Sequence, residues 1–172
     1  GYEYVNYTTK DGLLDNDVYG FFQCLSGTLW CLSVRGVNKF DGTGFINAFP
    51  EGALSKGMTL CMAQDRDSVL WFGTDHGLYR FDGKELAVFT DKDGIYSNII
   101  YSLTFDNEGN LWIGHHRGIA KFDLSLYKSS DRISFINYGT EEGLVGAECN
   151  QNAITKDHLG NVWFGTIKGA IV

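Results

Sequence analysis

All four tryptophans of the chain stand in the same local sequence context, and this repetition constrains the fold more than any other feature. The contexts Gly-Thr-Leu-Trp, Ser-Val-Leu-Trp, Gly-Asn-Leu-Trp and Gly-Asn-Val-Trp end at Trp30, Trp71, Trp112 and Trp163. The indoles are therefore separated by 41, 41 and 51 residues. A glycine follows each tryptophan at the sixth position, and an aspartate precedes three of the four by six residues. This pattern indicates an internal repeat of about 40 to 50 residues.

Inside one copy, the pattern of apolar residues predicts short strands joined by tight turns. In the third copy, β-branched and aromatic residues fill runs of strand length. The turn 106–109 ends in Gly109, which adopts positive φ without steric cost. Strands are expected at 99–105, 111–114 and 119–122, and an outer fourth strand is expected at 45–49 and 86–89 in the first two copies. Each copy therefore predicts a four-stranded antiparallel meander.

The central strands of such a meander are apolar on both faces, so each sheet must stack on others of its kind. Radial stacking gives a β-propeller; the alternative, a β-solenoid, has shorter coils that lack three hairpin turns per repeat. We predict an all-β chain of about four β-propeller blades, centred on the four tryptophans, forming a single segment over 1–172 of a larger propeller. Each indole is expected to be buried between neighbouring blades. The alternative role for the four tryptophans is a platform that stacks on sugars.

Composition excludes several other classes of protein. A formal charge of −7 and a pI near 4.9 give no general attraction for nucleic acid. No run approaches the ~18 apolar residues that span a membrane. The cysteines lack metal-ligand spacing and are interpreted as buried small hydrophobic residues, with one disulfide as the alternative. They are Cys24, Cys31, Cys61 and Cys149.

One unit carries a resemblance to a known family. The pattern Asp-x-x-Gly-Asn-Leu-Trp-Ile-Gly-x-x-x-Gly-Ile-x-Lys-Phe-Asp, from Asp106 to Asp123, resembles the two-component regulator propeller repeat, and related copies cover nearly the whole chain. The resemblance implies a propeller in the periplasmic sensing region of a bacterial hybrid two-component system, typically one that responds to polysaccharides. In such proteins the propellers precede an immunoglobulin-like domain, a membrane span and a histidine kinase.

The two ends of the chain carry further expectations. The fourth copy resembles the closing repeat of these arrays, and most of its extra residues are expected near Leu124 to Arg132. Residues 1–10 are expected to form the outermost strand of a preceding or closing blade, with the strand pattern in Tyr4 to Tyr7. Since about seven blades per ring are usual in this family, the chain is interpreted as a fragment. The alternatives are a small ring closed by the N-terminal strand and a larger ring formed with a second copy.

A ligand is expected on the face shared by two sets of turns. The loop that enters the innermost strand of a blade and the turn between its second and third strands lie at the same end of the sheet. Turns on a rigid scaffold commonly carry function, and amides, carboxylates and cations there suit hydroxyl-rich or anionic glycans. The candidate ligand-binding residues are Asn16, Asp17, Arg35, Lys56, Asp75, His76, Asn98, His115, His116, Arg117, Asn150 and Lys168.

No catalytic residue, metal site or cofactor is predicted. The adjacent His115 and His116 lack a carboxylate at ligand spacing. The repeated Asp65, Asp106 and Asp157 are interpreted as turn residues whose side chains accept backbone N–H groups. Sequences typical of a nucleophile elbow, a phosphate-binding loop or a zinc protease do not occur.

These observations together predict a periplasmic ligand-sensing segment that binds an oligosaccharide and signals to a histidine kinase in the full-length protein. The expected partners are the ligand, neighbouring blades, the immunoglobulin-like domain and a second copy in a homodimer. The alternatives are a propeller-type glycan lyase or hydrolase, which would use His76, His115, His116 or Glu148, and a scaffold that binds no ligand.

Overall fold

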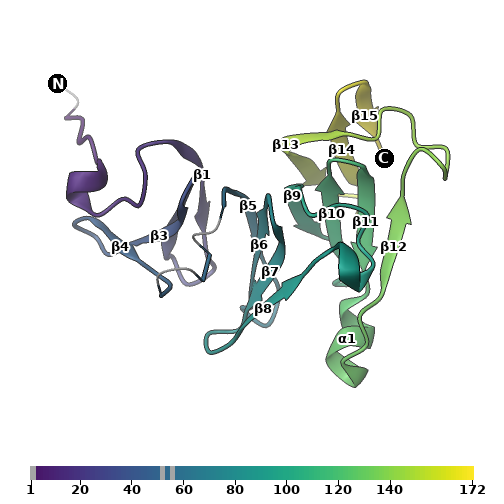
Figure 1. Cartoon of the computed structure of the whole chain (residues 1–172), viewed down its shortest axis with the longest axis horizontal. Coiled ribbons are helices and arrows are strands. Elements are labelled where there is room, and N and C mark those ends of the chain that lie inside the picture. Colours follow the sequence, from purple (N-terminus) through teal and green to yellow (C-terminus); the bar gives the residue numbers. More distant parts are fainter. Residues whose placement is uncertain (1–2, 51–52, 55–56) are drawn as a thin grey trace. The chain divides into compact units, whose positions relative to one another are not determined.

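The computed structural model describes residues 3–50, 53–54 and 57–172, and nearly all of their regular structure is β (Figure 1). The chain divides into two compact units, Gly1–Thr59 and Leu60–Val172. The sheet of the first unit has the order β1-β2-β3-β4 and contains β1 (Val18–Gln23), β2 (Leu29–Ser33), β3 (Gly36–Phe40) and β4 (Phe45–Asn47).

The second unit contains three further antiparallel sheets in sequence order. The first consists of β5 (Thr59–Gln64), which begins at the boundary between the units, β6 (Leu70–Thr74), β7 (Gly77–Phe81) and β8 (Leu86–Phe89). The next consists of β9 (Ile100–Phe105), β10 (Leu111–His115), β11 (Gly118–Phe122) and β12 (Phe135–Tyr138). The last consists of β13 (Cys149–Lys156), β14 (Val162–Thr166) and β15 (Gly169–Ile171).

The repeat therefore forms the antiparallel meanders that the sequence predicts. In the third copy the predicted strands match β9, β10 and β11, although the turn after β10 is shorter than expected. His115 and Gly118 pair across the end of the hairpin, so the turn consists of His116 and Arg117 alone. The predicted outer strands at 45–49 and 86–89 correspond to β4 and β8.

The described residues also include three short helices, the first of which precedes β1. They are the 3-10 helices η1 (Thr9–Asp11) and η2 (Asp91–Asp93) and the α-helix α1 (Leu124–Ser130). The insertion predicted near 124–132 is present, but its helical conformation was not foreseen. Asp123 caps the N-terminus of α1, because its carboxylate accepts a hydrogen bond from the backbone N–H of Leu126 at 2.9 Å.

Aspartates at the first hairpin turn hold both the turn and the tryptophan of their own sheet. Asp106 Oδ1 accepts hydrogen bonds from the backbone N–H groups of Glu108 and Asn110, as predicted. Its second oxygen accepts the indole N–H of Trp112 at 2.9 Å, which the sequence did not reveal. Asp157 holds Trp163 in the same way, also at 2.9 Å.

In the other two sheets this arrangement is altered. Cys24, which takes the place of the aspartate in the first copy, accepts the indole N–H of Trp30 on its sulfur at 3.0 Å. Asp65 still holds its turn, but its second oxygen accepts a hydrogen bond from Lys128 of α1 at 3.1 Å. The insertion that carries α1 is thus tied back to the sheet before it.

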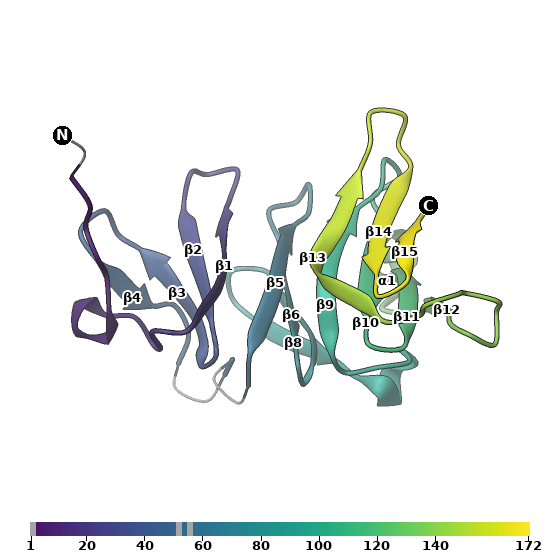
Figure 2. The same ribbon diagram turned by 90° about the horizontal axis from the view of Figure 1, so that it is seen from above.

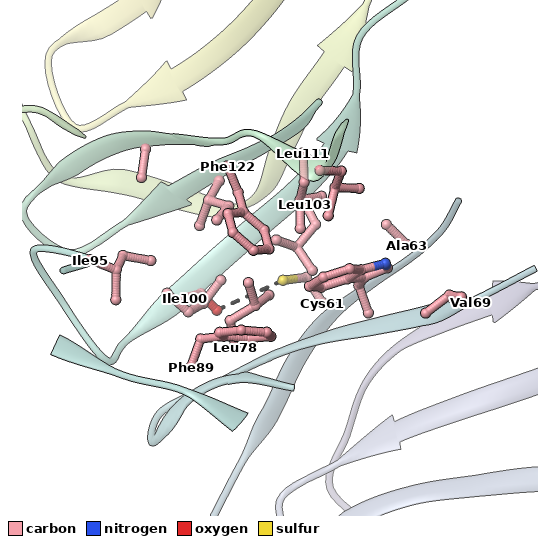
Figure 3. Packing of buried hydrophobic residues seen from close by; sticks show 14 residues of the cluster. Cys61, Ala63, Val69, Leu78, Phe89, Ile95, Ile100, Leu103, Leu111 and Phe122 are labelled. Atoms are coloured by element: carbon pink, nitrogen blue, oxygen red, sulfur yellow. Dashed lines mark hydrogen bonds between the residues drawn. The ribbon is translucent and has the colours of Figure 1, made fainter. Parts of the chain in front are cut away.

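The largest core of the second unit lies between the β5–β8 and β9–β12 sheets. Trp71, Phe122, Leu78 and Ile100 are buried there, and Figure 3 shows the Phe122 ring above Phe89 and Leu78. The thiol of Cys61 donates a hydrogen bond to the carbonyl oxygen of Ile100 at 3.8 Å. All four cysteines are free and buried, so the prediction that they act as small hydrophobic residues is confirmed.

Sheets of the second unit approach closely where the second strand carries a glycine. A Cβ atom on Gly73 would collide with Cys61 and with Ile100 of the following sheet, and one on Gly114 would collide with Ser102 and crowd Cys149. Figure 2 shows β13 beside β9, the first strand of the preceding sheet.

Burial of the tryptophans differs from the prediction at one of the four positions. Trp71 is completely buried, Trp30 is 7% exposed and Trp112 is half-buried. Trp163, however, is 40% exposed, so the prediction that every indole is buried between blades is wrong for this residue. The reason is that no further sheet among the described residues covers the face of β14 on which Trp163 lies.

Candidate functional site

The structure brings the entry loop and the second turn of a sheet together through backbone hydrogen bonds. In the β9–β12 sheet the N–H of His116 donates to the carbonyl of Ile99 at 3.1 Å. In the β13–β15 sheet the N–H of Ile167 donates to Glu148 at 3.1 Å, and in the first unit Val34 donates to Asp17 at 3.3 Å. We call the end of each sheet that carries these turns its turn face, and the term is applied to each unit by itself.

Several candidate residues support the loops themselves. The side-chain oxygen of Asn16 accepts the N–H of Thr9 at 2.9 Å, and that of Asn98 accepts the N–H of Asp91 at 2.7 Å. These two asparagines occupy the same position in two copies, and each fixes a 3-10 turn against the entry loop. The side-chain amides of both asparagines therefore stabilise the loops of the turn face.

Among the remaining candidates of the first two copies, Arg35 and His76 are exposed, whereas Asp75 is half-buried. Arg35 lies 3.4 Å from Asp15, and Asp75 lies 2.7 Å from His76. Asp17 and Lys168 are also exposed, and Asn150 is exposed but lies in β13 and not in a turn. Lys56 lies outside the described residues.

His115 does not point from the turn as expected but is completely buried. It occupies the position that Thr74 and Thr166 hold in other copies, where the hydroxyl accepts the N–H of the residue two places later. In the same way, His115 Nδ1 accepts the N–H of Arg117 at 3.1 Å. His115 therefore closes the hairpin and takes no part in the exposed surface of the turn face.

Burial lowers the pKa of His115 to about 4, and the electrostatic effects of the neighbouring Arg117 and His116 act in the same direction. The unfolded chain, with a histidine pKa near 6.5, binds this proton more readily than the folded chain. Stability is therefore lost as the pH falls from about 6.5 through 4, by about 3 kcal/mol in total. We expect a threonine at this position to reduce that loss.

The measurement is urea unfolding of the native chain and of His115→Thr at about pH 7.5 and pH 4.5. The difference in unfolding free energy between the two pH values should be smaller in the variant by about 2 to 3 kcal/mol. Other titrating groups are common to both chains, so an unchanged difference would show that His115 does not bind the proton selectively in the unfolded state.

Three exposed or half-exposed side chains form the main polar group of the turn face. His116 Nδ1 lies 3.2 Å from Glu148 Oε1, and the His116 ring lies edge-on to Tyr101 with 6.5 Å between ring centroids. Burial, together with the charge and hydrogen bond of Glu148, raises the pKa of Tyr101. We call Tyr101, His116 and Glu148 the turn-face cluster; it joins β9, the β10–β11 turn and the loop before β13.

A second group extends the polar surface beside the cluster. The Arg117 guanidinium lies 5.9 Å from the centre of the Tyr96 ring and donates to the Tyr96 carbonyl at 3.4 Å. Tyr96 donates its hydroxyl proton to Glu142 at 3.3 Å, and the charge of Glu142 raises the pKa of Tyr96. The sequence predicted His116 and Arg117 as site residues. It did not predict Tyr96 and Tyr101, because a tyrosine is common in strands and loops that have no function.

This surface offers chemical groups of the kinds that contact polar ligands. Aromatic rings offer apolar faces, while imidazole, carboxylate and guanidinium groups offer donors and acceptors. Within residues 3–50, 53–54 and 57–172, no group of three His, Cys, Asp or Glu side chains is arranged to hold a metal ion. None of the described helices is both long and apolar enough to cross a membrane.

The four meanders and their turn face define a repeat protein built from β-propeller blades. Residues 53–76 and 97–117 match the family model described as two component regulator propeller. The resemblance inferred from the Trp-Ile-Gly pattern is confirmed for these two segments of the chain. No curated protein matches the chain.

Solved structures confirm the fold class. The chain is similar to the extracellular domain of BT3049 from B. thetaiotaomicron, assigned to a hybrid two-component system, with 24% identity and a TM-score of 0.81 over 97% of this chain. It is also similar to the extracellular domain of BT4673 from the same organism, with 18% identity and a TM-score of 0.76 over 95% of this chain. The chain spans only 23% and 22% of those two structures.

A lyase shares the fold at a greater distance. Virginiamycin B lyase from Staphylococcus aureus is 16% identical, with a TM-score of 0.60 over 89% of this chain and 50% of the lyase. The TM-score shows a shared fold, and a likeness at this level of identity leaves activity open.

Proposed function

We propose that the chain is a ligand-recognition segment of a periplasmic sensor, that it binds an oligosaccharide at the turn-face cluster, and that binding is signalled to a histidine kinase in the same protein. The observation that carries the proposal is the meeting of Tyr101, His116 and Glu148 from two adjacent sheets. A ligand in contact with all three would bridge the β9–β12 and β13–β15 sheets.

The family repeats and the extracellular domains of similar fold support a sensor role. A sensor requires a ligand that binds two arrangements of the protein with different affinity, because equal binding shifts no population. A site made from two blades meets this condition, since a small change in the angle between the sheets alters the distance from His116 to Glu148. We expect this change in the angle between the sheets to be passed on to three partners: the neighbouring blades, an immunoglobulin-like domain and a second protomer.

The test is calorimetric titration of the chain with a panel of neutral and acidic oligosaccharides. We expect one class to bind, and we expect His116→Ala and Glu148→Gln each to weaken that binding at least tenfold, because each removes a directed hydrogen bond. His76→Ala is the matched control, since His76 lies on the equivalent turn of the preceding sheet and should leave affinity unchanged. Equal losses from all three variants, or binding unaffected by any, would contradict the proposed site.

The same titrations distinguish binding from catalysis. The imidazole and carboxylate 3.2 Å apart are also suited to proton transfer, which is the basis for the lyase or hydrolase alternative. Mass spectrometry of the oligosaccharides after incubation should show no change. New products that disappear in Glu148→Gln would replace the sensor role with an enzymatic one.

A further inference from the structure

The indole N–H of Trp71 lacks the acceptor that equivalent indoles have. Trp112 and Trp163 each donate to the aspartate six residues before them, at 2.9 Å. Trp71 is completely buried, yet its N–H has no hydrogen-bond partner among the described residues. A buried donor without an acceptor costs free energy, and native structures contain few of them. The missing bond therefore calls for an explanation in the surroundings of Trp71.

The residue six places before Trp71 is Asp65, which is held in its usual turn. Its Oδ1 accepts the backbone N–H groups of Asp67 and Val69, both at 2.9 Å. Asp106 Oδ1 holds the turn of the next copy in the same way. The Oδ2 atom of Asp65, however, accepts a hydrogen bond from Lys128 Nζ of α1 at 3.1 Å. The two copies therefore differ in what binds the second carboxylate oxygen.

Val69 explains why a lysine from another sheet binds there. In the two later copies an asparagine at this position donates its side-chain amide to the second aspartate oxygen, at 2.9 Å for Asn110 and 3.0 Å for Asn161. Valine has no side-chain donor. Lys128 supplies the missing donor, but it approaches from α1 and the indole is left without its bond.

The helix α1 connects β11 to β12 but also contacts the preceding sheet (Figure 1). The Tyr127 ring lies 5.6 Å from the ring of Phe89, and the Arg80 guanidinium lies 5.9 Å from the centre of the Tyr127 ring. Leu124 is buried at the start of α1. Lys128, near its end, is 39% exposed and forms the ion pairs with the β5–β6 turn. The polar attachment of α1 is therefore at its last turn.

The surroundings of the last turn of α1 leave room for it to move. A cavity of about 200 Å³ is lined by Phe105, Leu124, Ser125 and Lys128, among others. Asp131, which ends the helix, has φ 53°, a left-handed conformation that is uncommon for residues with a Cβ atom. The last turn can therefore change position while Leu124 stays buried.

We propose that Lys128 and Trp71 compete for Asp65 Oδ2, and that α1 is a latch with two states. In the latched state, which the structure shows, Lys128 binds Asp65 and Asp67 and the Trp71 N–H is unpaired. In the released state Asp65 accepts the Trp71 N–H, and the end of α1 loses its polar attachment to the β5–β8 sheet. One state leaves a buried donor unpaired and the other loses an ion pair, so the two costs oppose each other and both states are accessible.

The test follows the assigned indole N–H resonances of the isotope-labelled chain by proton–nitrogen correlation NMR. We expect the Trp71 proton to resonate upfield of those of Trp112 and Trp163, whose N–H groups bind carboxylates. In Lys128→Met, which keeps the apolar stem and removes the donor, it should move downfield toward them. The amide of Asp131, which donates to the Tyr127 carbonyl at 2.9 Å, should exchange with solvent about tenfold faster.

Lys121→Met is the matched control. Lys121 Nζ lies 4.0 Å from Asp106 Oδ2, the equivalent oxygen of the next copy, so this variant should leave the Trp71 resonance in place. Val69→Asn is an independent variant that restores the amide donor of the later copies, and it should move the Trp71 resonance in the same direction as Lys128→Met.

Three results would overturn the latch. The first is a Trp71 resonance that moves in neither Lys128→Met nor Val69→Asn. The second is an equal movement in Lys121→Met, which would show a general response to the loss of a lysine. The third is a Trp71 resonance beside that of Trp112 in the unmodified chain, because the indole would then already have an acceptor.

Discussion

Replacing Trp71 by alanine is expected to destabilise the second unit by about 3 to 5 kcal/mol. The indole is completely buried, stacks on Phe89 at 6.0 Å and lies edge-on to Phe122 at 5.8 Å. Its removal leaves a cavity in the main core, and the rigid β5–β8 and β9–β12 sheets close it only in part. Denaturant unfolding followed by circular dichroism measures the change.

Trp163→Ala is the matched control for this prediction. Trp163 occupies the same position of the repeat and donates its indole N–H to Asp157, but it is 40% exposed. We expect a smaller loss of about 2 kcal/mol, corresponding to one hydrogen bond and partial burial. Equal losses at the two positions would show that the sequence motif determines the stability, and that packing between sheets does not.

A second large effect is expected from Gly118→Ala, which should cost about 4 kcal/mol. Gly118 begins β11 with φ 141°, a conformation that residues with a Cβ atom rarely adopt, and the added atom would collide with the carbonyl oxygen of Tyr138 in β12. The strand pairing of β11 and β12 would have to shift to relieve the collision. The melting temperature and the denaturation midpoint should both fall.

Gly169→Ala separates the two causes of this loss. Gly169 holds the same repeat position with φ 131°, but an added Cβ atom would meet nothing within 4 Å. This variant should show only the cost of the backbone conformation, about 1 to 3 kcal/mol. If Gly169→Ala costs as much as Gly118→Ala, the collision with β12 contributes nothing.

The fold could be predicted largely because its determinants repeat. Strand patterns, turn aspartates and glycines recur at fixed offsets, so each copy supports the interpretation of the others. α1 could not be predicted in the same way, because it lies in the one insertion that has no counterpart in the other copies. Burial of Trp163 also depends on a neighbouring sheet, and a local pattern of residues contains no information about that sheet.

The candidate site was predictable in its location but only partly in its residues. Turns were expected to carry the site, and His116 does meet Glu148 there. His115 was misplaced because adjacent histidines look alike in sequence, whereas the hairpin requires a hydrogen-bond acceptor at the first of them. Comparison with Thr74 and Thr166 would have revealed this role. Tyr101 was missed because β-strand propensity explains a tyrosine in β9 without any function.

The bond from a turn aspartate to the indole six residues later also bears on how the chain acquires its structure. Asp106 and Trp112 close a loop within a single hairpin, so little chain entropy is lost before the contact forms. Isolated hairpins form in about 1 to 10 μs, far faster than sheets that pair distant segments. We therefore expect the hairpins of separate copies to form independently and early, with docking of one sheet on the next as the slow step. A chain of such units can begin folding at any copy, which suits a protein synthesised from one end.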